Sequence, residues 1–261
     1  MTRMHRRDRA TTGQAGSDQV VLHRIDEECI TRLEDETFAG LGCDGCGIVV
    51  LRGADSWGAH DRGCIELPTQ SRSLLVPIGY DEREAPLAVD QDGNEQSDLL
   101  LSLTDEDDFI ACAWARVRDG SPLMGVGIDL NALSHFAPRK SGRDYTHLLF
   151  TDHEKELAPQ LEPENPTLAK AALFAAKEAA FKSTAHPLRI WYEAQDEELL
   201  YEVRHFCMTE PGIERGEARN GAAQRAMDLM GIGRIEVHYV ELMGMALVTA
   251  VAIASEQASD E

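Results

Sequence analysis

The chain has 261 residues, with 46 acidic and 25 basic side chains and a formal net charge of −21. Neither half of the sequence is basic, and nucleic-acid binding needs clustered lysine and arginine to neutralise phosphates, so we expect no nucleic-acid partner. No apolar stretch reaches the roughly 18 residues that span a membrane. The composition therefore predicts a soluble, cytoplasmic protein without a membrane partner, and we expect a monomer.

The first 19 residues, MTRMHRRDRATTGQAGSDQ, are basic but lack the apolar core of a signal peptide. We interpret residues 1–19 as a disordered leader. The rest of the chain is long enough for two units, which we place at 20–122 (the N-terminal half) and 123–261 (the C-terminal half).

Strands and short helices are expected through the first half. Residues 20–36 have a helical or mixed period, and 47–53 and 73–80 read as strands bounded by turn residues. Residues 87–98 form a polar, hairpin-like connection. The segment DFIACAWARV, at 108–117, is a strand rich in small residues that follows an acidic turn.

Cysteine spacing in the first half leaves two interpretations open. Cys43 and Cys46 form a Cys-x-x-Cys pair, and His60 and Cys64 follow at a distance that resembles a zinc knuckle or finger. The alternative is a glycine-rich turn beside a strand. In an intracellular chain the cysteines would be kept reduced.

A short apolar strand opens the second half. Met124 to Leu130 is continuous and apolar, and Asp129 stands at its end, where an ionisable side chain can project into a cleft. Residues 144–159 then predict a helix, a break and a second helix, which Thr151 or Asp152 caps.

The clearest helix of the chain is expected at 165–185. Asn165 or Thr167 can cap it, and Pro166 stands near its first position, where proline is favoured. Its alanine-rich interior has high helix propensity.

Four strands are predicted in the remaining sequence, at 189–194, 199–208, 232–242 and 245–255. The last of them shares its small and β-branched composition with 108–117. This similarity suggests an internal repeat, and hence an α/β (α+β) fold of two similar halves that form a cleft between them.

Charged residues on the 165–185 helix are candidates for chemistry. Glu178 and Lys182 are four residues apart and share one face. Alone they could be a surface ion pair, but together with Asp129 they suit a Mg²⁺ ion and an anionic ligand, because Mg²⁺ takes one or two carboxylates and fills its shell with phosphate oxygens and water.

The motifs around these residues resemble the paired signature of the 4′-phosphopantetheinyl transferase superfamily. The second-half matches are GVGIDL at 125–130, HLLFTDHEKEL at 147–157 and FAAKEAAFK at 174–182, and weaker first-half matches lie at 84–89 and 101–115. They are most similar to the long, single-chain class, in which two similar halves form a pseudodimer with the active site in the cleft between them. Residues 1–83 carry no motif of the family.

The resemblance implies a Mg²⁺-dependent enzyme that transfers the 4′-phosphopantetheine arm of coenzyme A to a serine of an acyl or peptidyl carrier protein. Asp129 and Glu178 would bind Mg²⁺, and Glu178 would accept the serine proton. Lys182 would stabilise charge on the leaving nucleotide. Lys177, Lys182 and Thr104 would contact the coenzyme.

The sequence departs from the family pattern at two places. Asn131 stands where an acidic residue is frequent, and it could offer a carbonyl oxygen to the metal. Thr104 and Asp105 stand where a serine–histidine pair usually contacts the coenzyme. An aspartate facing phosphate is unfavourable, so Asp105 either faces elsewhere or weakens coenzyme binding.

These departures favour an alternative, a non-catalytic relative that binds a carrier protein or a nucleotide. A third interpretation, a different Mg²⁺-dependent phosphotransfer enzyme, has no P-loop or dinucleotide motif to support it.

Overall fold

The computed structural model describes residues 27–52, 64–68, 73–138, 146–194, 202–203, 206 and 221–255. Its first-half elements are α1 Glu27–Phe38, β1 Cys43–Arg52, β2 Cys64–Pro68, β3 Ser73–Tyr80, β4 Pro86–Ala88, β5 Leu99–Glu106 and β6 Phe109–Val117. Its second-half elements are β7 Leu123–Ala132, the short 3-10 helix η1 Leu133–His135, α3 Thr146–Leu149, α4 Asp152–Leu161, α5 Pro166–Ser183, α6 Ala185–Ala194, α7 Gly221–Met230, β8 Ile232–Leu242 and β9 Met245–Ala254. The expected leader, 1–19, lies outside the described residues.

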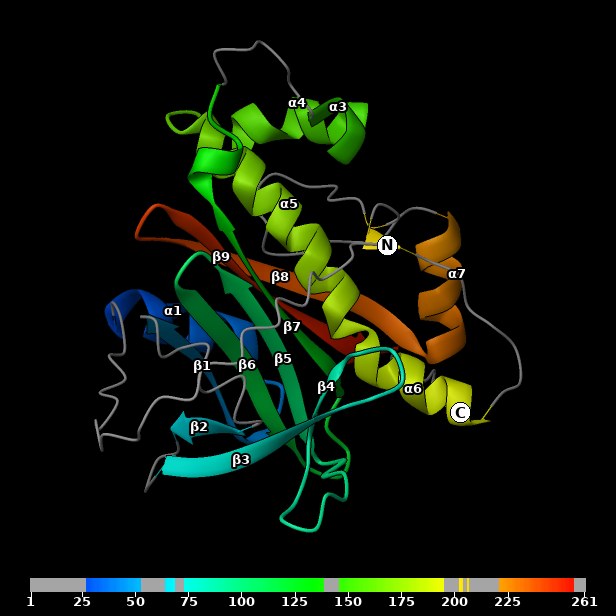
Figure 1. The fold of residues 1–261 in the computed structure, drawn as a ribbon. Coiled ribbons are helices and arrows are strands. Elements are labelled where there is room, and N and C mark those ends of the chain that lie inside the picture. The colour runs from blue at the N-terminus through cyan, green and yellow to red at the C-terminus, as the bar shows by residue number, and fades with distance from the viewer. Residues whose placement is uncertain are drawn as a thin grey trace, which may run out of the picture.

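Three antiparallel sheets organise the mixed α/β fold, with the strand orders β1-β6-β5, β2-β3-β4 and β7-β9-β8 (Figure 1). The two small-residue-rich segments noted in the sequence are β6 and β9. Each occupies the centre of its sheet, with the first strand of its half on one side and its hairpin partner on the other. This shared strand order supports the predicted duplication, although the pseudodimer itself stays a prediction.

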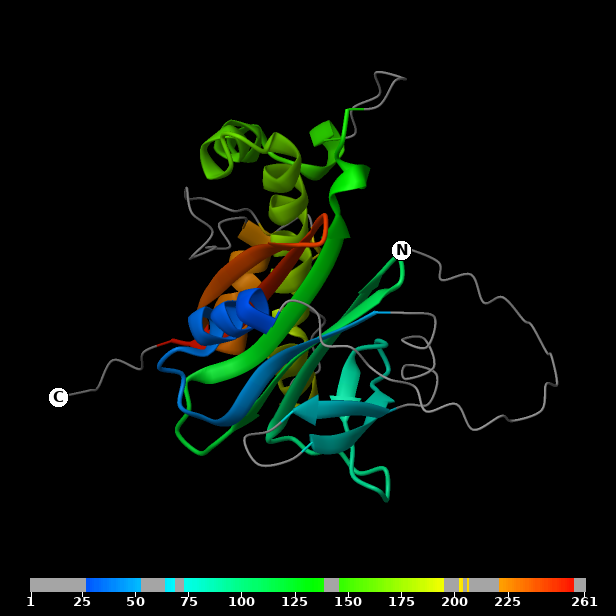
Figure 2. The same ribbon diagram turned by 90° about the vertical axis from the view of Figure 1, so that its left-hand side faces the viewer.

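Both halves contribute to one hydrophobic core. Strands β5 and β6 pack against β7, and a continuous cluster joins side chains of β1 and β6 to those of β7 and β9. Helix α1 lies against the β8–β9 pair of the other half (Figure 2), and Thr37 and Thr249 share a buried hydrogen bond of 2.6 Å there. Groups from β5, β7 and α5 therefore meet between the halves.

Helix α5 lies across the sheet β7-β9-β8, in contact with all three strands (Figure 1). Asn165 caps it by accepting a hydrogen bond from the Leu168 N–H, and Pro166 follows, as predicted. The approach to β7 is very close: a Cβ on Gly127 would lie 1.9 Å from the Ala179 carbonyl oxygen. Glycine on the strand and alanine on the helix thus bring α5 within reach of β7 side chains.

One predicted strand is wrong, and one lies mostly outside the described residues. Residues 189–194 belong to α6. Leu188 and Trp191, three residues apart, both pack against the hydrophobic cluster around α5, and this spacing suits a helix and not a strand. Of 199–208, only 202–203 and 206 are described. The strands expected at 73–80, 108–117, 232–242 and 245–255 are confirmed, as is the one expected at 47–53 over its described residues, 47–52.

Candidate functional site

Asp129 is the centre of a polar cluster between the halves. Its side chain lies on β7, in the buried interior of the strand rather than at its end. Thr104 of β5 and Lys182 of α5 both donate to its Oδ1, at 3.0 and 2.7 Å, and the Asn131 amide donates to its Oδ2 at 3.0 Å. Three donors from three elements fix this carboxylate in one orientation.

Glu178 faces the same point from α5. Burial raises its pKa to about 8, with the Asp129 charge adding to the rise and Lys182 opposing it. A hydrogen bond between the carboxyl groups of Glu178 and Asp129 also favours the protonated form. The two carboxyl groups that the sequence placed 49 residues apart therefore converge.

Glu106 is a third carboxyl group near this point, and the sequence analysis missed it. Burial is the main cause of its raised pKa; the His135 side chain opposes the rise, and Asp129 adds to it. The His135 Nδ1 lies 3.4 Å from Glu106 Oε1. The alternation of side chains along a strand could have predicted its position. Because β5 continues to Glu106, Thr104 and Glu106 share a face.

The side chain of Asp105 lies on the opposite face of β5 from Thr104. It lies between Thr104 and Glu106 on β5 and is exposed, whereas Thr104 is buried. Alternation along the strand directs Asp105 away from Asp129. Its carboxylate therefore does not face the polar cluster.

Lys177 lies outside the cluster formed by Asp129, Glu178 and Lys182. Its ammonium donates to Glu154 Oε2 and to the Leu149 carbonyl, both at 3.0 Å, and its side chain is only 2% exposed. Neighbours on a helix point about 100° apart, so Lys177 turns beneath α4 while Glu178 faces β7. Glu154 also completes a capping box with Thr151. The Phe-Thr-x-x-Glu segment and Lys177 together attach α4 to α5.

Lys182 connects the cluster to a pocket. Its ammonium also donates to the Ile128 carbonyl, at 3.1 Å, and its side chain is 30% exposed. The pocket has a volume of about 270 Å³ and lies between the β3–β4 turn, β5 and the α5–α6 junction. Arg83 and Lys182 supply cationic groups to its wall, and Leu101, Leu103 and Phe181 supply apolar ones.

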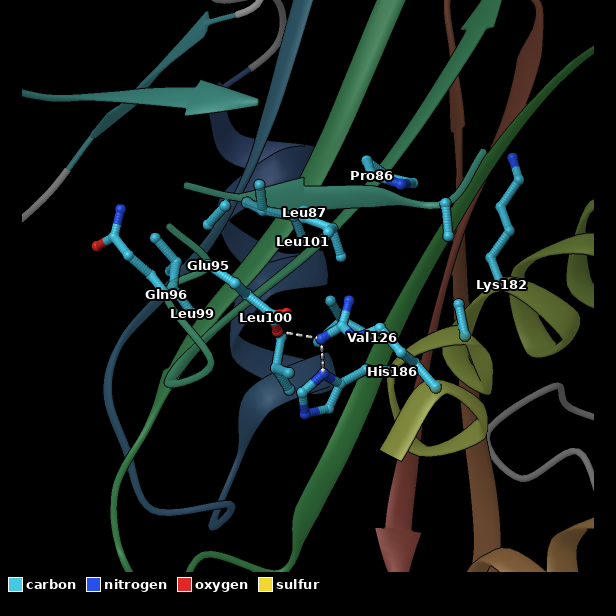
Figure 3. Close-up of a pocket in the computed structure, with 14 residues that line it drawn as sticks. Pro86, Leu87, Glu95, Gln96, Leu99, Leu100, Leu101, Val126, Lys182 and His186 are labelled. Carbon is cyan, nitrogen blue, oxygen red and sulfur yellow. Dashed lines mark hydrogen bonds and ion pairs between the residues drawn. The ribbon is translucent and has the colours of Figure 1, made fainter. Parts of the chain in front are cut away.

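A smaller pocket beside Lys182 shows how α6 meets the N-terminal half (Figure 3). Arg189 of α6 pairs with Glu95, which lies in the connection between β4 and β5, and also contacts His186 Nδ1 at 2.9 Å. Burial, and then the Arg189 charge, lower the pKa of His186 to about 4. On the same helix, the Tyr192 ring stacks under the Arg83 guanidinium at 3.4 Å. These contacts hold α6 at the rim of both pockets.

The donor set around Asp129 fits Mg²⁺ better than zinc. Two convergent carboxyl groups offer hard oxygen ligands, and a divalent cation would offset their mutual repulsion. Within the described residues, no three His, Cys, Asp or Glu side chains are arranged to hold a metal ion. Cys43, Cys46 and Cys64 do not form such a set either, and His60 lies outside the described residues.

Comparison with known families supports the resemblance seen in the sequence. Residues 125–215 match the family model described as the 4′-phosphopantetheinyl transferase superfamily. The matched segment contains Asp129, Lys177, Glu178 and Lys182. No curated protein matches the chain.

Solved structures of acyl carrier protein synthases are similar to about half of the chain. The Mycobacterium tuberculosis enzyme is 23% identical, with 51% of this chain and 99% of that one covered and a TM-score of 0.35. The Neisseria meningitidis holo-[acyl-carrier-protein] synthase is 21% identical, with 50% and 98% covered and a TM-score of 0.37. A Chronobacterium ammoniagenes ACPS-CoA complex is 18% identical, with 50% and 97% covered and a TM-score of 0.35. Every helix among the described residues is too short or too polar to cross a bilayer.

Proposed function

We propose that this chain is a 4′-phosphopantetheinyl transferase, which moves the phosphopantetheine arm of coenzyme A to a serine of an acyl or peptidyl carrier protein. The convergence of Asp129, Glu178 and Lys182 is the observation that carries the proposal, and Lys182 also lines a pocket formed by both halves. The family match over residues 125–215 supports it.

Asp129 and Glu178 would bind Mg²⁺ together with the pyrophosphate of the coenzyme. When bound, the ion supplies a Lewis acid and a template for the reacting phosphate. Thr104 and Asn131 hold Asp129 in place by hydrogen bonds to its two oxygens. This role replaces the coenzyme contact expected for Thr104 and accounts for Asn131 without a direct metal bond.

Glu178 is the proposed proton acceptor for the serine hydroxyl. Without a bound cation, burial and the Asp129 charge raise its pKa to about 8, and a bound Mg²⁺ would favour the charged carboxylate that accepts the proton. The attack forms a bond between the serine oxygen and the phosphorus of the arm and breaks its bond to 3′,5′-bisphosphoadenosine. Lys182 is placed to stabilise the negative charge that develops on this leaving group.

The pocket of about 270 Å³ is the proposed site for coenzyme A, the co-substrate. Arg83 and Lys182 can neutralise phosphate charge, while the leucines of β5 and Phe181 provide an apolar wall. These two cations would have to act locally, because the net charge of the chain is −21 and Asp81 and Glu84 line the same pocket. We propose a structural role for Lys177, because it is buried against Glu154.

The test is conversion of an apo carrier protein to its holo form, followed by intact-mass spectrometry with Mg²⁺ and coenzyme A. We expect the purified chain to add one phosphopantetheine arm per carrier. Lys182→Ala should slow the transfer strongly, while Lys170→Ala, at a half-exposed site on the same helix, should not.

The non-catalytic alternative predicts a different result. If several apo carriers stay unmodified while a known transferase converts them, and the chain still binds one of them, the chain is a binding protein and the proposal is wrong.

A further inference from the structure

The Cys-x-x-Cys pair of β1 has no role in the proposed transfer, yet the strand brings its two side chains together. In a regular strand, residues three apart point to opposite faces. Here the register shifts between Cys43 and Gly45, so that Asp44 is an extra residue in a β-bulge. Cys43 lies opposite Val117 and Cys46 opposite Ala115.

Because Val117 and Ala115 are two apart on β6, they share a face, and so do the cysteines opposite them. Gly45 and Gly47 lie on the other face of the strand, against Trp114. The bulge therefore converts a spacing that would separate the sulfurs into one that places them side by side. Their thiols are hydrogen-bonded to each other.

The two thiols have unequal environments. The hydrogen bond from Cys46, and then the nearby Arg118 charge, lower the pKa of Cys43, while donation of that bond raises the pKa of Cys46. Arg118 is fixed beside Cys43, since its Nε donates to the Gly42 carbonyl at 2.6 Å and lies 3.3 Å from Asp44 Oδ1. Cys43 thus has the character of an attacking thiolate and Cys46 that of a resolving thiol.

The pair is also accessible. Cys46 is exposed and Cys43 is half-buried, whereas Cys112 is fully buried and burial raises its pKa. Cys64, the fourth cysteine whose side chain is described, lies on β2 in another sheet. Strand β6 separates β1 from β5, which carries Thr104 and Glu106, so the pair is remote from the proposed catalytic cluster.

We propose that Cys43 and Cys46 form a redox site, which low-molecular-weight disulfides oxidise to an intramolecular disulfide and thiols reduce again. The Cys43 thiolate attacks one sulfur of the small disulfide, forms a mixed disulfide and expels one thiolate. Cys46 then loses its proton to solvent, attacks the Cys43 sulfur and expels the second thiolate. Two protein thiols and one small disulfide become one protein disulfide and two small thiols.

The experiment uses the full chain, purified under reducing anaerobic conditions and then incubated with glutathione disulfide. Trypsin releases residues 33–52 as one peptide, in which Cys43 and Cys46 are the only cysteines. We expect the intact mass to fall by two hydrogens without a glutathione adduct. The 33–52 peptide should resist alkylation until a reductant is added.

Variants distinguish the two thiols. Cys46→Ser should accumulate a glutathione adduct at Cys43, and Cys43→Ser should react several-fold more slowly at Cys46. Cys64→Ser is the matched control and should form the disulfide normally, with unchanged folding by circular dichroism.

Three outcomes would overturn the proposal. They are alkylation of both cysteines in the 33–52 peptide after oxidation, a bond from either cysteine to another part of the chain, and a stoichiometric metal ion that both variants lose. Transfer to an apo carrier is measured on the same samples, so failure of the redox site and failure of the proposed transferase function are separate results.

Discussion

Two lysines of α5, five residues apart, illustrate how similar ion pairs can differ in role. Lys177 pairs with Glu154 at 3.0 Å, and both side chains are buried, with further bonds to Leu149 and Thr151. Lys182 pairs with Asp129 at 2.7 Å but is 30% exposed and borders a pocket. The first pair is enclosed by its partners and holds two helices together.

The second pair has Glu178 beside it, with a pKa raised to about 8. Two neighbouring carboxyl groups repel each other when both are charged, so binding of a cation or a proton stabilises the site. The comparison teaches that the surroundings of an ion pair, and not its length, distinguish a structural contact from a candidate catalytic one.

The largest effect is expected at the second pair. Glu178→Gln keeps the shape and hydrogen-bonding capacity of the side chain but removes the proposed proton acceptor. We expect transfer to fall by about 10²–10⁴-fold, the usual contribution of acid–base catalysis, with little loss of stability. The measurement is kcat for carrier conversion, with thermal unfolding as the control. Unchanged turnover would remove Glu178 from the mechanism.

Substitutions in the first pair, Lys177 and Glu154, should instead change the free energy of unfolding. Lys177→Met leaves the Glu154 carboxylate buried without its cation, which costs about 3–5 kcal/mol in the free energy of unfolding. Adding Glu154→Gln removes the charge, keeps the cap with Thr151, and should restore part of the loss. Denaturant unfolding measures both, and Lys155→Met, in an exposed pair with Asp152, should change stability by less than about 1 kcal/mol.

A full loss of transfer in folded Lys177→Met protein, without any loss of stability, would reverse the roles assigned to the two lysines.

A pH dependence follows from Glu178. Its pKa rises from 4.5 to about 8 on folding, so the folded chain binds a proton that the unfolded chain releases. Without divalent cations, this contribution to stability is complete below pH 4.5 and is lost as the pH rises through about 8. Denaturant unfolding across this range should show the decline, and Glu178→Gln should show less of it. Equal slopes for both proteins would contradict the raised pKa.

The smallest effect is expected from substitutions of Glu106 and Asp105, two neighbouring acidic residues of β5. Glu106 helps to raise the pKa of Glu178, so Glu106→Gln should shift the pH profile of transfer modestly toward lower pH. Asp105→Asn should leave both the profile and the stability unchanged, within about 0.5 kcal/mol, since Asp105 is exposed on the opposite face. A larger shift from Asp105→Asn would place its side chain in the site.

Local sequence patterns were sufficient for α5 and for β6 and β9, the central strands of their sheets, but they left Asn165 and Thr167 both open as the cap of α5. They failed at 189–194, where aromatic and β-branched residues favoured a strand but packing against the helical core selects a helix. Glu106 was missed for a related reason: the acidic run at 105–108 was interpreted as a turn, whereas β5 includes its first two residues and only 107–108 form the turn.

The sequence by itself determined the helix that carries Lys177, Glu178 and Lys182, because capping and helical period depend on neighbours along the chain. Only the tertiary structure decided what each of them faces. The close approach of α5 to Gly127 brings Glu178 and Lys182 to Asp129, and the packing of α4 takes Lys177 away from it. Such contacts join residues far apart in the chain. A local sequence pattern therefore does not show which partner each of two adjacent side chains, such as Lys177 and Glu178, will contact.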